Sequence, residues 1–181
     1  MIRLVLGGEK SGKSDLAYGL FLQAFGRGPG PGAGMVLAMG LARDAGFRTQ
    51  ILNHRQRRDP AVPLAEPGLE LAQALGSARS QAVPVLVDSL DFWVFSCLEA
   101  GQDRTGQLLQ SLLDWSGPGA PDCVLVSCEV GLGPLAATAL TRRFVRLMGD
   151  LNQRLAETAD EVRLAVAGLS LMLKGGGNGL Y

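Results

Sequence analysis

Residues 7–14 read GGEKSGKS and match the phosphate-binding pattern G-x-x-x-x-G-K-[ST]. The glycines of this motif let the backbone turn tightly, so that successive N–H groups point inward at an anion. Its lysine brings a positive charge to the β and γ phosphates of a nucleotide, and its serine offers a hydroxyl to Mg²⁺. We therefore expect a nucleotide site formed by Gly7, Gly8, Glu9, Lys10, Ser11, Gly12, Lys13 and Ser14. Lys13 is expected to act in catalysis and Ser14 to bind the metal.

The segments on either side of the motif support this interpretation. The apolar run 2–6, IRLVL, is typical of a buried strand, and a helical pattern follows from Lys13 to Phe25. A strand that leads through this loop into a helix is the arrangement that the motif requires, and the helix N-terminus adds a partial positive charge. A glycine-rich turn without function is the alternative, and this context argues against it.

Strands and helices alternate along the rest of the chain. Further strands are predicted at 35–39, 84–90, 123–127 and 162–168, with 169–174 pairing beside the last one. Helices are predicted at about 44–57, 68–79, 91–99, 105–115 and 137–158. The segment 25–34, FGRGPGPGAG, predicts a flexible surface connection. The alternation predicts a single-domain α/β P-loop fold, with a mostly parallel sheet and helices on both faces.

The helix predicted at 137–158 has one continuous apolar face. The residues on it are Leu140, Phe144, Leu147, Met148, Leu151 and Leu155. The predicted domain covers residues 1–175, and the glycine-rich end 176–181 is expected to be a loose tail.

Composition limits the classes of function. A chain of 181 residues is long enough for one well-packed domain, and its formal net charge of +0 argues against a protein that binds nucleic acid by charge alone. Its three cysteines form neither a disulfide framework nor a metal-binding pattern, so we expect reduced, buried thiols. No apolar run reaches membrane-spanning length. We expect a cytoplasmic protein.

A P-loop needs a second carboxylate near the metal, usually at the end of a neighbouring strand. Asp88 follows the apolar residues 85–87 and fits this role, so we expect it to bind Mg²⁺ together with Ser14. A plain turn residue at a strand end is the alternative. Asp91 is a weaker candidate, because it could instead cap the following helix.

His54 is the only histidine, and it lies in a basic segment with Arg48, Arg55, Arg57 and Arg58. On composition alone, a single histidine is more often a surface residue without a function. The functional alternative is a nucleophile, because a neutral imidazole can attack phosphorus and form a phosphoramidate. Neighbouring arginines would then stabilise the charge on the phosphate. The residues by themselves leave both interpretations open.

Six segments resemble, in order, the bifunctional adenosylcobinamide kinase / adenosylcobinamide-phosphate guanylyltransferase family of cobalamin biosynthesis. Residues 7–14 resemble that family's GGARSGKS loop, and residues 44–58, DAGFRTQILNHRQRR, resemble its segment with the histidine. The others are AEPGLELAQAL (65–75), VLVDSLDFWVFSCL (85–98), VLVSCEVGLG (124–133) and LNQRLAETADEVRLAVAGLSLMLKG (151–175). The resemblance covers the chain from Met1 to about Gly175.

The resemblance implies a RecA-like P-loop fold and a homotrimer that acts twice on one corrinoid substrate. By this resemblance, ATP or GTP is expected to phosphorylate the hydroxyl of the aminopropanol arm of adenosylcobinamide. GTP then transfers GMP to the product through a guanylylated histidine, which aligns with His54. The resemblance also assigns nucleotide contacts to Ala38, Met39, Gly40, Arg55, Gln56, Arg57, Glu66 and Asp88.

Some positions differ from the family pattern. They are Met39, Gly46, Phe47, Gln50, Asp91, Cys128, Ala136 and Arg146. Asp91 stands where the family has threonine, and Cys128 where it has asparagine. None of the differences changes Lys13, Ser14, Asp88 or His54, so we expect nucleotide chemistry to be retained. The differences bear instead on corrinoid and guanine recognition.

Two alternatives to the bifunctional enzyme stay open at this point. One is a P-loop kinase with a single activity on another small alcohol, for which His54 would be dispensable. The other is a nucleotide-sensing protein without turnover, which the substitutions Gly46 and Cys128 motivate. The residues do not identify the general base of the kinase step.

Overall fold

The computed structural model describes residues 1–25, 34–40, 59–115, 117, 119–133 and 137–175. Its elements, in chain order, are β1 (Ile2–Gly7), α1 (Lys13–Ala24), β2 (Met35–Ala38), β3 (Leu64–Ala65), α3 (Leu71–Ser80), β4 (Val85–Asp88), α4 (Leu90–Glu99), α5 (Thr105–Leu113), β5 (Cys123–Cys128), α6 (Ala139–Thr158), β6 (Glu161–Val166) and β7 (Leu169–Lys174). The predicted helix 44–57, nearly all of the loop 25–34 and the tail 176–181 lie outside the described residues.

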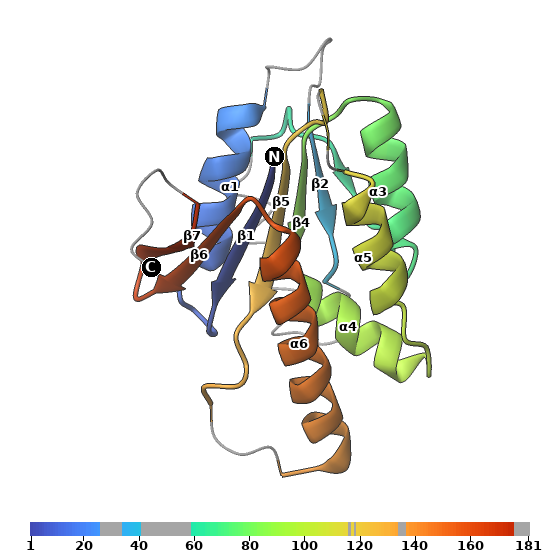
Figure 1. Ribbon diagram of the computed structural model, residues 1–181, viewed down its shortest axis with the longest axis vertical. Coiled ribbons are helices and arrows are strands. Elements are labelled where there is room, and N and C mark those ends of the chain that lie inside the picture. Colours follow the sequence, from blue (N-terminus) through green and yellow to red (C-terminus); the bar gives the residue numbers. More distant parts are fainter. Residues whose placement is uncertain (26–33, 41–58, 116, 118, 134–136, 176–181) are drawn as a thin grey trace.

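The described strands form one sheet in the order β3-β2-β4-β5-β1-β6-β7 (Figure 1). Neighbouring strands are parallel, except that β7 runs antiparallel to β6. The predicted mostly parallel sheet is therefore confirmed. The short edge strand β3 was not predicted, because its two residues are too few to show a periodic pattern.

Both faces of the sheet are covered, as its apolar strands require. Alternate residues of β1 and β5 point to opposite faces: Val5, Val124 and Val126 pack with α1, whereas Leu4 and Leu125 pack with the other layer. This second layer consists of α3, α4, α5 and α6 (Figure 1). The prediction of helices on both faces is confirmed.

The apolar face predicted for α6 is buried over only part of its length. Met148, Leu151 and Leu155 are fully buried, but Leu140 is 49% exposed. In Figure 1 the first turns of α6 extend beyond the end of the sheet, where they have no strand to pack against. The predicted apolar face is therefore buried only in its C-terminal part.

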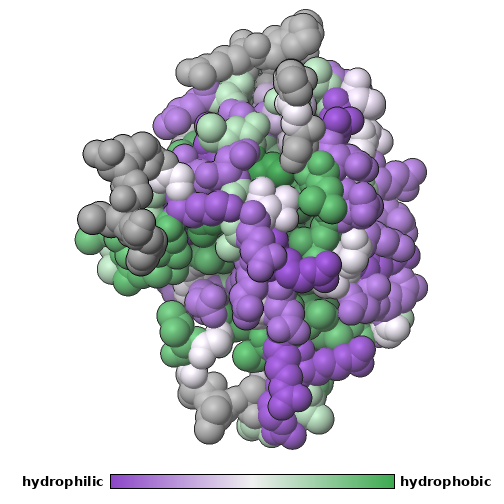
Figure 2. Space-filling model, viewed as in Figure 1, coloured by the Kyte–Doolittle hydropathy of each residue, from purple (hydrophilic) through white to green (hydrophobic). Residues whose placement is uncertain are grey.

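The hairpin β6–β7 ends the described chain. Its turn residues Ala167 and Gly168 both have positive φ, 51° and 78°, as a tight two-residue hairpin turn requires. All six residues of β7 are exposed, and four of them are apolar: Leu169, Leu171, Met172 and Leu173. Figure 2 shows this apolar surface at the sheet edge, whereas the outward face of α6 is polar. None of the described helices is both long and apolar enough to cross a membrane.

Candidate functional site

The predicted phosphate loop connects β1 to α1 at the carboxyl edge of the sheet. Gly12 stands at the N-cap of α1 with φ 89°, a conformation that favours glycine, and no side chain caps this described helix. Its first N–H groups are therefore directed at the loop and can bind an anion. Lys13 is only 9% exposed, and its ammonium group donates to the carbonyl of Gly8 at 3.2 Å. The loop thus places a buried cation beside free amide donors.

The turn of the β6–β7 hairpin packs directly against this loop. The amide of Gly168 donates to the carbonyl of Ser11 at 2.9 Å, and a Cβ on Gly12 would lie 3.2 Å from the Cα of Gly168. A Cβ on Gly7 would lie 2.8 Å from the carbonyl oxygen of Ala165 in β6. The β6–β7 hairpin, from the C-terminal part of the chain, therefore stabilises the conformation of the N-terminal phosphate loop.

Asp88 lies where the sequence predicted it, at the end of β4. The hydroxyl of Ser14 donates to its Oδ1 at 3.1 Å, although β5 separates β4 from β1 in the sheet. A hydroxyl and a carboxylate, both oxygen ligands, thus stand together beside the phosphate loop. This pair has the donor chemistry that Mg²⁺ prefers, so the residues present fit the expected metal.

Ala38 ends β2, and Met39 and Gly40 follow it; Ala38 and Met39 lie next to Asp88. Ala38 is the register partner of Asp88, and the amide of Met39 donates to the carbonyl of Asp88 at 3.1 Å. The Met39 side chain points into the core at 4% exposure, so its backbone is the part of this residue that faces the edge.

Glu66 follows the edge strand β3 on the same side of the sheet, beyond β2. Four strand spacings of about 4.8 Å separate β3 from β1, or about 19 Å. Glu66 therefore lies along the same edge as the phosphate loop but outside contact distance of it. His54, Arg55, Gln56 and Arg57 lie outside the described residues.

A buried polar network that sequence reasoning missed lies beneath the site. The Ser127 hydroxyl donates to Oδ1 of Asn152 at 2.6 Å, and the Asn152 amide donates to the carbonyl of Cys128 at 3.0 Å. The network ties the end of β5 to α6. Asn152 is 5% exposed and stands on the buried face of α6 between Leu151 and Leu155. A polar residue on that apolar face was the signal that could have revealed it.

Two buried side-chain oxygens of the described residues have no hydrogen-bond partner, and both lie at this edge. They are Oγ of Ser11, in the phosphate loop, and Oδ1 of Asp91, in the first turn of α4. An unsatisfied buried polar group costs about 1–3 kcal/mol. Burial raises the pKa of Asp91, and the hydrogen bond with the Ser89 side chain and the positive charge of Lys13 oppose this only partly. Asp91, a weaker candidate in the sequence, is thus a half-buried residue with one buried, unpaired carboxyl oxygen.

The three cysteines are buried, as predicted. Burial raises the pKa of Cys97 to about 11 and that of Cys123 to about 12, and it also raises the pKa of Cys128. Thiols held in the protonated form are poor nucleophiles and poor metal ligands. Within the described part of the chain, moreover, no cluster of histidine, cysteine or acidic side chains could hold a metal ion by itself.

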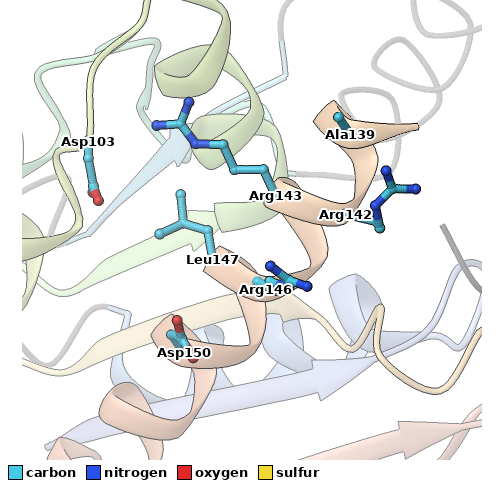
Figure 3. Close-up of a pocket in the computed structure, with 7 residues that line it drawn as sticks. All are labelled: Asp103, Ala139, Arg142, Arg143, Arg146, Leu147 and Asp150. Carbon is cyan, nitrogen blue, oxygen red and sulfur yellow. The ribbon is translucent and has the colours of Figure 1, made fainter. Parts of the chain in front are cut away.

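A separate open hollow of about 390 Å³ lies beside the N-terminal half of α6 (Figure 3). Arg142, Arg143 and Arg146 line it together with Asp103 and Asp150. The pKa of Asp103 is lowered, mainly by hydrogen bonds from Thr105 and to a smaller degree by Arg143. No phosphate-loop residue lines this hollow. Arg146, which differs from the family pattern, therefore lies on a surface separate from the predicted phosphate loop.

Comparisons with known proteins agree with this geometry. Residues 3–173 match the model of a family described as cobinamide kinase / cobinamide phosphate guanyltransferase. The bifunctional adenosylcobalamin biosynthesis protein CobP of Pseudomonas aeruginosa is 35% identical, over 95% of this chain and 96% of its own. The corresponding protein CobU of Salmonella typhimurium is 28% identical, over 96% of this chain and 100% of its own.

A solved structure from Pyrococcus horikoshii OT3 matches 96% of this chain and 86% of its own, with a TM-score of 0.55 and 10% identity. At this identity the likeness concerns the fold alone. The expected α/β fold, a mostly parallel sheet with helices on both faces, is confirmed. The match of the family model over nearly the whole chain, together with the identity to CobP, shows that the chain belongs to the cobinamide kinase / cobinamide phosphate guanyltransferase family.

Proposed function

We propose that this protein is a bifunctional transferase of cobalamin biosynthesis, which phosphorylates adenosylcobinamide and then transfers GMP from GTP to the product. The proposal rests on family membership, and one geometric observation carries it: Ser14 and Asp88 meet beside the buried Lys13. That arrangement is suited to holding a nucleoside triphosphate.

In the kinase step, the hydroxyl of the aminopropanol arm attacks the γ-phosphorus of ATP or GTP. Lys13 and the free N–H groups at the start of α1 stabilise the charge on the phosphoryl oxygens. Ser14 and Asp88 would hold Mg²⁺, which neutralises phosphate charge when it is bound. Ala38, Met39 and Gly40 would contact the nucleotide through the backbone, and Glu66 would act farther along the same edge.

In the guanylyl step, His54 attacks the α-phosphorus of GTP and releases diphosphate. The phosphate of adenosylcobinamide phosphate then attacks the His54-bound GMP, which gives adenosylcobinamide-GDP and frees the imidazole. Arg55, Gln56 and Arg57 follow the nucleophile in sequence, and the two arginines supply positive charge for this step.

We also propose that the protein works as a homotrimer in the cytoplasm. The exposed apolar edge strand β7 supports self-association, because an uncovered apolar strand is a ready site for pairing with another copy. The buried, unpaired cysteines support a reducing compartment.

The test compares the wild type with a His54→Ala variant. With Mg²⁺ and α-labelled GTP, the wild type should acquire acid-labile, base-stable label and the variant none. With γ-labelled ATP or GTP and adenosylcobinamide, both should form the phosphorylated corrinoid. Unlabelled wild type with an intact kinase step would indicate a kinase of single activity. GTP binding with neither reaction would indicate a sensing protein and overturn the proposal.

A further inference from the structure

Asn152 belongs to the long helix α6, yet its side chain is bound to the last two residues of β5. It donates to the carbonyl of Cys128 at 3.0 Å and accepts the Ser127 hydroxyl at 2.6 Å. A carbonyl can only accept, so the atom that faces Cys128 must be the amide nitrogen, and the amide oxygen must face Ser127. Two different partners therefore fix the orientation of this buried amide.

The carbonyl that Asn152 binds belongs to the same peptide group as the N–H of Glu129. This N–H donates to the carbonyl of Gly7 at 3.1 Å, and Gly7 is also the register partner of Cys128. A peptide group is planar, and in the trans form its C=O and N–H point in opposite directions, so a tilt of one tilts the other. The peptide between residues 128 and 129 thus joins Asn152 on one side to the first residue of the phosphate loop on the other.

The start of the phosphate loop is supported from both neighbouring strands. On the β6 side the contact is steric, because a Cβ on Gly7 would lie 2.8 Å from the carbonyl oxygen of Ala165. On the β5 side the support is the N–H of Glu129, whose direction depends on the bond from Asn152. Both hydrogen bonds of Asn152 are buried, so water is not at hand to replace them.

We infer that Asn152 is a positioning residue of the phosphate loop. It touches no phosphate; it holds the peptide that holds the carbonyl of Gly7, and so sets the direction in which the loop amides meet the nucleotide. Cys128 takes part only through its carbonyl, so its difference from the family pattern leaves this contact intact. The inference rests on the proposed function, because it requires that the loop bind a nucleotide.

The experiment measures nucleotide affinity in the full chain by titration calorimetry. The probe is α,β-methylene-GTP with Mg²⁺, in which the bond that His54 would break is replaced. Asn152→Leu removes both hydrogen bonds of the amide, and we expect it to raise Kd by about 3- to 10-fold, the effect of one hydrogen bond. Asn152→Asp is the second variant: at pH 8 its carboxylate still accepts the Ser127 hydroxyl but cannot donate to the carbonyl, so Kd should rise as well.

Two controls separate positioning from a general loss of stability. Leu155→Ala truncates a fully buried side chain about one turn farther along α6, which lowers stability but leaves the bond from Asn152 to Cys128. Ser127→Ala removes the other partner of Asn152 and also keeps that bond. Both should bind the probe with the Kd of the wild type. Hydrogen exchange adds a local measurement: the Glu129 amide should exchange faster in Asn152→Leu than in Leu155→Ala.

Two results would overturn the inference while the proposed function stands. One is a wild-type Kd for a folded Asn152→Leu or Asn152→Asp variant. The other is an equal rise in Kd for Leu155→Ala, which would assign the effect to stability alone. A wild type that does not bind the nucleotide would instead overturn the proposed function, and this inference with it.

Discussion

The two glycines that open the phosphate loop differ in the space around them, so the same substitution should destabilise the protein at one of them and not at the other. A Cβ on Gly7 would lie 2.3 Å from Oγ of Ser11 and 2.8 Å from the carbonyl oxygen of Ala165. The Ser11 side chain can rotate, but the backbone of β6 is paired with β1 and β7 and cannot shift without disturbing the sheet. A Cβ on Gly8 would meet nothing within 4 Å. Neither glycine has a positive φ, so the contrast is purely steric.

Gly7→Ala should therefore lower the free energy of unfolding by about 1–3 kcal/mol, the usual cost of overpacking. In a chain of this size that is about 2–12 °C in Tm. Gly8→Ala should leave Tm unchanged. The measurement is thermal unfolding by circular dichroism without nucleotide, so that ligand binding does not contribute. An unchanged Tm for Gly7→Ala, or an equal decrease for both variants, would refute the reasoning.

Three further predictions follow from the buried network, the thiols and the edge strand. Asn152→Leu should lower the free energy of unfolding in urea by about 2–6 kcal/mol, because it removes the hydrogen bonds of Asn152 to the Ser127 hydroxyl and the Cys128 carbonyl. Adding Ser127→Ala should recover part of that stability. A double variant without any recovery would contradict the network. Burial raises the pKa of the Cys97 thiol from 9.0 to about 11 and that of the Cys123 thiol from 9.0 to about 12. The thiols of the unfolded chain therefore lose their protons at a lower pH than those of the folded protein. The free energy of unfolding should consequently fall as the pH rises above about 9. Replacing both by alanine should weaken that dependence in urea titrations, and equal slopes would contradict it. Leu171→Glu on β7 should reduce the mass measured by light scattering, whereas Leu113→Glu on the exposed side of α5 should not; an unchanged oligomer in both would exclude β7 as the interface.

Local sequence patterns predicted most of the elements correctly. The phosphate loop, the buried strands β1, β4 and β5 and the helix starting at Lys13 each depend on contiguous residues with a clear period or a fixed turn chemistry. The boundaries shifted by one to three residues, as at α3, which begins at Leu71 rather than 68. Helix ends depend on what they pack against, so the sequence pattern alone does not define them to the residue.

The features that the sequence left undecided depended on contacts between distant segments. Leu140 belongs to an apolar pattern but lies on turns of α6 that extend past the sheet. The position of Asp91 in the sequence suggests a helix-capping residue, yet the fold leaves its Oδ1 buried and without a partner. Sequence spacing does not show which residues of one element meet the end of another.

The sequence by itself predicted a nucleotide site at residues 7–14 and determined that the chain folds as a mostly parallel α/β sheet, because tight turns, amphipathic periods and a phosphate-binding motif are properties of neighbouring residues. Only the tertiary structure decided that Ser14 meets Asp88, that Gly168 supports Ser11 across 157 positions, and that Asp91 has a buried, unpaired oxygen. Each of these features follows from the order of the strands in the sheet. That order is set by burial over the whole chain and not by any local stretch of it.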